Sequence, residues 1–473
     1  MITAIGGILL PLSLILANRP WRLLALVFFY SVFAAAAIVT VGGAGITPAL
    51  VPASLFALSF LVSVFSGVRY PGERRALVLL TPFILVVTGA LASSVIMPRL
   101  FLGEVLVWPQ KVSLFFVRSP LAPNAGNYTQ DMYLLSNALL TTTAAIYLTR
   151  PGAKLGKLFD CYLSASFLAD AIAFWQFAGN TFHVWYPTAF FLSNPGWAQL
   201  SDESVGSLIR LNGTFSEPSS LSAYLSAVVC ASAWLILNGD KRRMPRFAFG
   251  FGLVVVLVST ATTGYTTLGA MICLLVLRSV ASGSAKFKQR AAAGLFAGLM
   301  VITTVVVVTP MIAPKVASEA AMVVTSTLNK GQTSSYRART AVDHDSFGEM
   351  VATSGLGVGW GSNRSSSLLP GLCAAIGIWG IGGLIWFGIS LYLGLRKIPR
   401  YTRNSELRLV VNGASAAVLS TLVSGVISEP TISSPDFYLL LAILVAAAAR
   451  VPQRSAAMMS QDIKSAKPVH SNL

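Results

Sequence analysis

Residues 247–277 read FAFGFGLVVVLVSTATTGYTTLGAMICLLVL and contain no charged side chain. The run is longer than the roughly 20 apolar residues that one helix needs to cross a bilayer. Arg246 precedes it and Arg278 follows it, each with further basic residues nearby. Positive charge accumulates on the cytoplasmic side of membrane proteins, so both flanks are predicted to lie on that side. The run is therefore predicted to form a hairpin of two short spans that turns near residues 262–264.

The composition of the whole chain is that of an integral membrane protein. Of its 473 residues, 55% are hydrophobic and 11% are charged, whereas roughly 25% are charged in ordinary soluble domains. The mean hydropathy is +0.71. These figures exclude a soluble enzyme, a disordered chain, a collagen-like chain and a disulfide scaffold.

Further apolar stretches long enough to cross the hydrocarbon core lie on both sides of the hairpin. They are residues 2–17, 22–41, 48–68, 76–97, 131–149, 157–178, 219–238, 291–312, 371–395, 409–428 and 436–449. The expected fold is an all-α polytopic membrane protein, with residues 1–473 forming one integral membrane domain of about 12–13 transmembrane helices and two long periplasmic loops. Segment 2–17 lacks a clear signal-peptide cleavage site and is predicted to remain as an uncleaved helix.

The basic residues follow the predicted topology. The chain has 34 Lys and Arg against 17 Asp and Glu, a net charge of +17. Most of the Lys and Arg fall in short loops predicted to be cytoplasmic, such as 239–246, 278–290 and 396–408, and in a predicted polar cytoplasmic tail at 450–473. Such charge faces anionic lipid, so the expected partner is the membrane and not nucleic acid.

Function is expected in the two long outside loops, residues 179–218 and 313–370, because binding and catalytic residues concentrate in such segments. Positive charge outside the membrane is not required by the topology, yet both loops carry arginines. The candidate site residues are Arg210, Glu217, Arg337, Arg339, His344 and Arg364.

Glu217 precedes Pro218, where a span begins. Proline favours the first helical turn, and a carboxylate favours the positive end of the helix dipole, so Glu217 is either a capping residue or a general base. A partly desolvated carboxylate at the membrane face has a raised proton affinity and can take a proton from a sugar hydroxyl.

The stretch 335–351 is predicted to form a short amphipathic helix, since its apolar residues recur at spacings of three and four. Arg337 and His344 then lie on one stripe. Arg339 and Asp343 lie four residues apart, at the spacing of an exposed salt bridge, which is the alternative to a functional role for Arg339. His344 is either a surface histidine or a catalytic one.

Four glycines alternate with other residues from Gly355 to Gly361, just before Arg364. Such a segment either lets backbone N–H groups approach a phosphate or forms a flexible turn. Asp343-His-Asp345 has the form of a weak metal motif, but a solvated acidic pair is favoured and no metal is expected. Asp170, inside a predicted span, is expected to line a cavity.

Three stretches, taken in order, resemble those of the Wzy-type O-antigen and exopolysaccharide polymerases, whose plan the O-antigen ligases share. They are Arg210-Leu-Asn-Gly-Thr-Phe-Ser-Glu-Pro-Ser, Ser-Thr-Ala-Thr-Thr-Gly at 259–264, and Gly355-Leu-Gly-Val-Gly-Trp-Gly-Ser. The resemblance covers about residues 205–395, and the N-terminal half is similar only in topology.

The resemblance implies glycan transfer from an undecaprenyl-diphosphate carrier to a sugar hydroxyl at the outer face of the bacterial inner membrane, without metal or other cofactor. Arg210, Arg337, Arg339 and Arg364 would bind the diphosphate, and Glu217 or His344 would act as the base. A flippase and a chain-length regulator are the implied partner proteins. Ligases usually place a histidine just before the span at 371–395, where this chain has serines at 365–367, so a polymerase is favoured over a ligase.

Two other classes stay open. A transporter for the same lipid-linked oligosaccharide is disfavoured, since such proteins often show internal repeats and none is found here. A metal-dependent lipid-linked glycosyltransferase would carry acidic residues in its first outside loops, whereas residues 42–47 contain none and residues 98–130 only Glu104. Binding of the lipid-linked oligosaccharide without turnover would support the transporter. Loss of activity in EDTA would support the metal-dependent glycosyltransferase.

Overall fold

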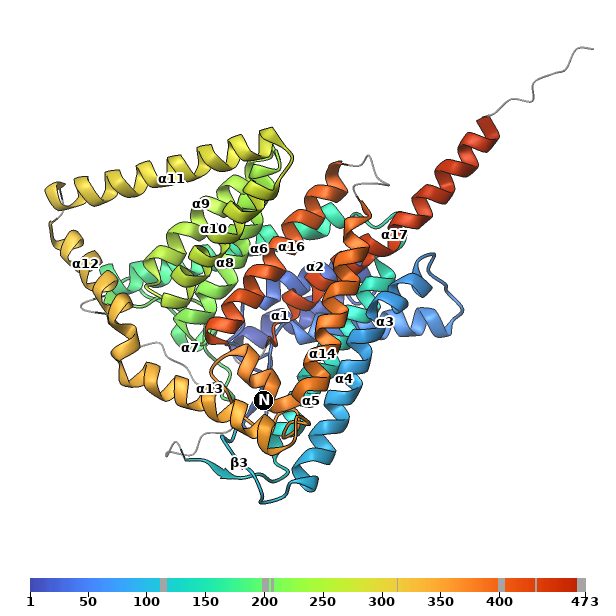
Figure 1. Cartoon of the computed structure of the whole chain (residues 1–473), viewed down its shortest axis with the longest axis horizontal. Helices are drawn as coiled ribbons and strands as arrows, with labels where there is room; N and C mark the ends of the chain where they lie inside the picture. The colour runs from blue at the N-terminus through green and yellow to red at the C-terminus, as the bar shows by residue number, and fades with distance from the viewer. Residues whose placement is uncertain are drawn as a thin grey trace, which may run out of the picture.

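The computed structural model describes residues 1–110, 117–197, 204–205, 208–312, 314–398, 405–429 and 432–465. Most of them are helical, and the long helices run between two ends of a bundle (Figure 1). We call the end that carries residues 183–197, 208–217 and 329–367 the loop end. The opposite end, with the short basic connection 238–242, is the basic end.

The part of the chain before residue 210 forms helices and short strands. The elements are α1 (Ala4–Ile15), α2 (Pro20–Ser31), β1 (Val39–Val41), β2 (Ala44–Ile46), α3 (Leu50–Phe65), α4 (Glu73–Leu100), β3 (Leu106–Val107), β4 (Ser119–Pro120), α5 (Ala125–Tyr147), α6 (Leu155–Phe182), α7 (Thr188–Phe191), β5 (Ser204–Val205) and β6 (Leu208–Ile209). The strands pair antiparallel as β1 with β2, β3 with β4 and β5 with β6.

The part after residue 217 is helical. Its elements are α8 (Pro218–Leu237), α9 (Arg243–Val258), α10 (Thr262–Ala281), α11 (Ala285–Ile312), α12 (Pro314–Leu328), the 3-10 turn η1 (Asn329–Gln332), α13 (Ser334–Ala352), α14 (Leu368–Arg396), α16 (Ser405–Ser428) and α17 (Pro435–Ser465). In Figure 1, α11 runs along the upper left edge, α12 along the left edge and α13 along the lower edge.

Seven helices of the described chain are long and apolar enough to cross a membrane: α4, α6, α8, α10, α11, α14 and α16. The predicted polytopic, all-helical fold class is thereby confirmed. Two further apolar helices, α1 and α3, are shorter. Every predicted span contains a helix, and the total of about 12–13 crossings stays a prediction.

The hairpin predicted over residues 247–277 is present, as α9 and α10 separated by Ser259–Ala261. Thr260 adopts a positive φ of 52° at the turn. The hydroxyls of Ser259 and Ser222, on α8, lie 2.7 Å apart. This contact fixes the turn against the helix that leads out of the first long loop.

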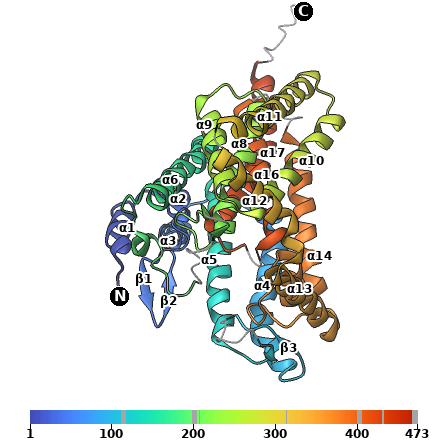
Figure 2. The same ribbon diagram turned by 90° about the vertical axis from the view of Figure 1, so that its left-hand side faces the viewer.

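The core lies where α8 packs against α16 and α9, and α17 against α5 (Figure 2). Small residues let these backbones approach closely, as is usual between membrane helices. A Cβ on Gly252 of α9, for example, would lie 3.1 Å from the side chain of Val229 on α8. The packing sets the ends of α8, α16 and α17 beside one another at the loop end.

The predicted span 22–41 is corrected by the structure, since α2 ends at Ser31 and β1 follows. The segment between them hydrogen-bonds to the first long loop. The Ala35 N–H donates to the Thr214 carbonyl at 3.0 Å, and the Asn194 N–H donates to the Ala35 carbonyl at 3.1 Å. In this segment, long-range hydrogen bonds to the loop take the place of the backbone hydrogen bonds of a continued helix.

Two predicted segments are more helical than expected. The second long loop, 313–370, contains α12 and α13, and α13 (Ser334–Ala352) confirms the short helix expected over 335–351. The predicted polar tail begins inside α17, which continues to Ser465 and projects beyond the bundle in Figure 1. Residues 466–473 of that tail lie outside the described part of the chain.

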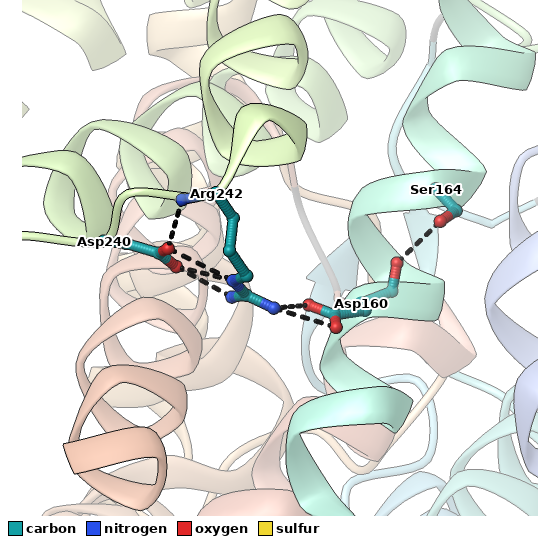
Figure 3. Close-up of polar contacts among 4 residues, drawn as sticks. All are labelled: Asp160, Ser164, Asp240 and Arg242. Carbon is teal, nitrogen blue, oxygen red and sulfur yellow. Dashed lines mark hydrogen bonds and ion pairs between the residues drawn. The ribbon is translucent and has the colours of Figure 1, made fainter.

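An ion-pair network joins α6 to the connection between α8 and α9 at the basic end (Figure 3). Arg242 donates from Nη1 to both oxygens of Asp160, at 2.7 and 2.9 Å, and from Nη2 to Asp240 at 2.8 Å. Burial acts to raise the pKa of Asp240, but the hydrogen bonds and charge of Arg242 outweigh it and lower that pKa. The network ties the basic ends of two core helices together.

Candidate functional site

The stretch from Arg210 to Glu217 is a buried loop between α6 and α8. Its buried side chains are at most 5% exposed, and they are Leu211, Asn212, Thr214 and Phe215. Gln176 on α6 accepts through Oε1 from the N–H groups of Asn212 and Gly213, at 3.1 and 2.7 Å. Its Nε2 donates to Oδ1 of Asn212 at 2.6 Å. The loop is therefore held rigidly against a core helix.

Arg210 and Glu217 stand at the two ends of this loop, and both are half-buried. Arg210 interacts electrostatically with Tyr265 on the first turn of α10. Glu217 occupies the N-cap position of α8, yet its side chain does not bond to the helix backbone. Its Oε2 accepts instead from the Ser219 hydroxyl at 2.9 Å. Glu217 therefore stands at the capping position without capping the helix, and its carboxylate remains available to accept a proton.

Two further carboxyl groups lie near Glu217. Glu429 follows α16 directly, and Asp436 stands in the first turn of α17. Burial raises the pKa of Glu429 to about 7, and the charges of Asp436 and Glu217 act in the same direction. Three helix ends thus bring three carboxyl groups within electrostatic reach of one another.

Glu429 and Asp436 line a cavity of about 110 Å³ at the loop end, as does Ser216, the neighbour of Glu217 in the chain. We call it the carboxylate cavity. The residues that line it include Tyr30, Tyr133, Ser216, Tyr224, Glu429 and Asp436. Glu429 and Asp436 were not among the candidates from sequence. A signal for Glu429 was present, because the tripeptide Ser-Glu-Pro occurs at both 216–218 and 428–430.

The predicted residues on α13 face solvent. Arg337 and His344 are exposed, as their common stripe predicts, and Arg339 is half-buried. Asp343 does not turn toward Arg339 but accepts from the N–H groups of Ser366 and Ser367, at 2.7 and 3.1 Å. Asp343 therefore joins α13 to the start of α14.

The glycine-rich stretch 355–361 is neither a flexible turn nor a free row of donors. Its four glycines all have positive φ, between 75° and 97°. A Cβ on Gly357 would lie 2.7 Å from the Ala374 carbonyl, and one on Gly359 would lie 2.6 Å from the Ser93 carbonyl. Only glycine fits these positions.

The N–H groups of this stretch also have partners within the protein. Those of Gly357, Val358 and Trp360 donate to Thr353, Ala374 and Ser93. They are therefore not directed at a bound phosphate. Arg364, which follows the stretch, is exposed.

The α13 helix carries one buried acid that sequence reasoning missed. Glu349 is 1% exposed, and its two carboxyl oxygens have no hydrogen-bond partner among the described residues. Burial raises the pKa of Glu349 to about 8, although the charge of Arg118 acts against this and that of Asp345 adds to it. Asp345 itself accepts from Trp108 Nε1 at 3.0 Å. No spacing in the sequence distinguishes Glu349 from a solvated glutamate.

Asp170, expected to line a cavity, does not line the carboxylate cavity. It is 3% exposed on α6, and neither carboxyl oxygen has a partner in the described part of the chain. Tyr224 on α8 is close enough to interact electrostatically with it. The carboxyl group is thus buried between core helices.

The structure brings some predicted residues together and separates others. Arg210 and Glu217 share one loop, whereas α13 packs mainly on α14. Within the described ranges no hydrogen bond or ion pair joins His344 to Glu217. The same ranges contain no group of three or more His, Cys, Asp or Glu side chains able to hold a metal ion.

The carboxylate cavity, the buried loop and the α13 helix all lie at the loop end of a bundle of apolar helices. The sequence matches no protein-family model and no curated protein. The helices by their length and hydropathy establish a multi-pass membrane protein.

Proposed function

We propose that this protein is a polysaccharide polymerase of the bacterial inner membrane. It joins oligosaccharide repeat units carried on undecaprenyl diphosphate into a surface polysaccharide or exopolysaccharide, at the periplasmic face and without a metal. The resemblance of residues 205–395 to Wzy-type polymerases supports this reaction class. The flippase and the chain-length regulator remain proposed partners.

One observation carries the proposal: a single buried loop holds Arg210 and Glu217 at its two ends, beside the carboxylate cavity. A glycosyl transfer of this kind needs a base for the acceptor hydroxyl and cations for the leaving diphosphate. The loop supplies one of each. Its bonds to Gln176 fix their positions before substrate binds, which lowers the cost of ordering the site.

The proposed reaction has one proton transfer and one displacement. Glu217 takes the proton of an acceptor sugar hydroxyl as the hydroxyl oxygen bonds to the anomeric carbon of the donor. The bond between that carbon and the diphosphate oxygen breaks, and negative charge grows on the diphosphate. Arginine side chains at the loop end, Arg210 first and Arg337, Arg339 and Arg364 from the second segment, stabilise that charge.

A transporter of the same lipid-linked oligosaccharide is the second candidate. Asp170 supports it, because a buried carboxyl group without a partner inside a membrane helix is typical of ion-coupled transport. An O-antigen ligase would use the same donor, but this chain has serines at 365–367 where ligases usually have a histidine. Ser366 and Ser367 donate to Asp343, and Ser367 is the N-cap residue of α14.

The test is reconstitution of the purified protein with lipid-linked repeat units from the source cells. A ladder of longer glycans supports the polymerase. One transfer to lipid A core supports a ligase, and movement of the lipid across the bilayer without a new glycosidic bond supports a transporter. Activity that EDTA abolishes would contradict the metal-independent reaction.

A further inference from the structure

The carboxylate cavity has the chemistry of a saccharide site. Tyr30, Tyr133 and Tyr224 line its wall. Glu429 and Asp436 contribute carboxyl groups. Small-molecule sites typically combine apolar and aromatic walls with a few polar groups that orient the ligand. A volume of about 110 Å³ corresponds to about three or four waters, at roughly 30 Å³ each, or to the hydroxyl-bearing edge of a sugar ring.

Tyr224 indicates that something polar completes this wall. The residue lines the cavity and is 9% exposed, and its hydroxyl has no hydrogen-bond partner among the described residues. A buried hydroxyl without a partner is costly. The neighbouring Asp436 carboxylate accepts from the Ser434 hydroxyl and, in the described part of the chain, forms no hydrogen bond with Tyr224. A ligand hydroxyl at this point would supply the missing partner.

The charges around the cavity select the kind of ligand. Glu429 interacts electrostatically with both Glu217 and Asp436 there, and Arg210 lies at the far end of the buried loop. Carboxylates repel a diphosphate and accept hydrogen bonds from hydroxyl groups. The cavity therefore favours an uncharged, hydroxyl-rich group, and the diphosphate belongs on the arginine side.

We propose that the carboxylate cavity is the acceptor subsite, in which Glu429 and Asp436 bind hydroxyls of the acceptor sugar and position one hydroxyl at Glu217. The proposal rests on the polymerase function. Ser216 lines the cavity and is adjacent in sequence to Glu217. A sugar bound in the cavity would therefore place one of its hydroxyls near the Glu217 carboxylate. Glu429 is thus a positioning residue, and Glu217 keeps the catalytic role.

The experiment measures binding of a carrier-free sugar to the intact protein in nanodiscs. The probe is the repeat-unit oligosaccharide released from the lipid-linked donor by mild acid. Trp197 lies at the edge of the cavity, so tryptophan fluorescence reports occupancy, and equilibrium dialysis of labelled probe confirms it. Saturable binding by the wild type is expected, and inorganic diphosphate at millimolar concentration should leave it unchanged.

Two variants and one matched control locate the binding. Glu429→Gln replaces a carboxyl oxygen by an amide NH2 group, removes one hydrogen-bond acceptor and should weaken binding about tenfold, the equivalent of one hydrogen bond. Ala223→Leu adds bulk to the cavity wall without changing charge and should weaken binding at least as much. Glu104→Gln changes an exposed carboxylate on the α4–α5 connection and should bind like the wild type.

The two hypotheses fail in different ways. If the wild type makes polymer but both cavity variants, shown to be folded by size exclusion, bind the probe normally, the acceptor subsite is refuted and the polymerase stands. Absence of probe binding by the wild type, or competition by diphosphate, also refutes the subsite. If binding depends on the cavity but no polymer forms, the cavity binds a glycan and the polymerase proposal is wrong.

Discussion

Gln176 and Asn212 hold each other through two hydrogen bonds, one from the amide of Gln176 to Oδ1 of Asn212 at 2.6 Å and one from the N–H of Asn212 to Oε1 of Gln176 at 3.1 Å. They lie 36 residues apart in the chain. This pair joins a core helix to the loop that positions Arg210 and Glu217.

Replacing Gln176 by Leu should destabilise the protein and impair the site together. The change leaves the buried N–H groups of Asn212 and Gly213 without an acceptor, at a cost of about 1–3 kcal/mol. A lower Tm and slower polymer synthesis are expected. Gln289→Leu changes an exposed glutamine and serves as the control. Unchanged Tm in the Gln176 variant would mean that the loop has another anchor.

Arg242 should couple energetically to Asp160. The ion pair joins α6 to the α8–α9 connection, and Arg242 is 44% exposed. Because solvent screens an exposed pair, the expected coupling energy is about 1 kcal/mol. A double-mutant cycle of Arg242→Ala and Asp160→Ala, read from thermal or denaturant unfolding, measures it. Strict additivity of the two single effects would show that the pair contributes nothing.

Glu349 should make stability depend on pH between about 4.5 and 8. Burial raises its pKa from the ordinary 4.5 of a glutamate to about 8 in the folded protein. Below the lower value both states are protonated, and as pH rises toward 8 the unfolded state alone loses its proton, so the stability contribution is progressively lost.

The Glu349→Gln variant tests this directly. It removes the titration, so its Tm relative to the wild type should be higher at pH 8 than at pH 5. Glu104→Gln, at an exposed position, should show no such difference. An equal Tm offset at both pH values would contradict the raised pKa of Glu349.

The loop end should face the periplasm. The reason is the distribution of Lys and Arg, most of which lie in short connections assigned to the cytoplasm. In a variant whose four native cysteines are replaced, an impermeant maleimide should label His344→Cys in intact cells. Arg243→Cys should react only after lysis. Labelling of position 243 in intact cells would invert the topology.

Glu217 and not His344 is expected to be the base. Loss of a general base lowers the rate roughly 10²–10⁴-fold, and Glu217→Gln keeps the size of the side chain. Polymer synthesis and Tm are measured on Glu217→Gln and His344→Gln. Slow turnover with an unchanged Tm is expected for Glu217→Gln alone. An active Glu217→Gln beside a folded, inactive His344→Gln would assign the base to His344.

Hydropathy and charge alone determined the membrane class, the hairpin at 247–277 and the helix at 335–351. Each is a local property: the free energy of transferring a run of side chains into hydrocarbon, or the period of apolar residues on one helix. The end of α2 at Ser31 was not predictable in this way. It depends on hydrogen bonds to Thr214 and Asn194, far along the chain.

For the candidate site, too, some features could be predicted from the sequence and others depend on tertiary contacts. Arg210, Glu217 and the arginines of the second segment could be chosen from sequence, because charged residues stand out between apolar spans. The grouping of Glu217 with Glu429 and Asp436 was decided only by the tertiary structure, since close packing of α8, α16 and α17 brings their ends together. The glycines at 355–361 likewise owe their role to neighbours on α4, α5 and α14, whose backbones leave no room for a Cβ.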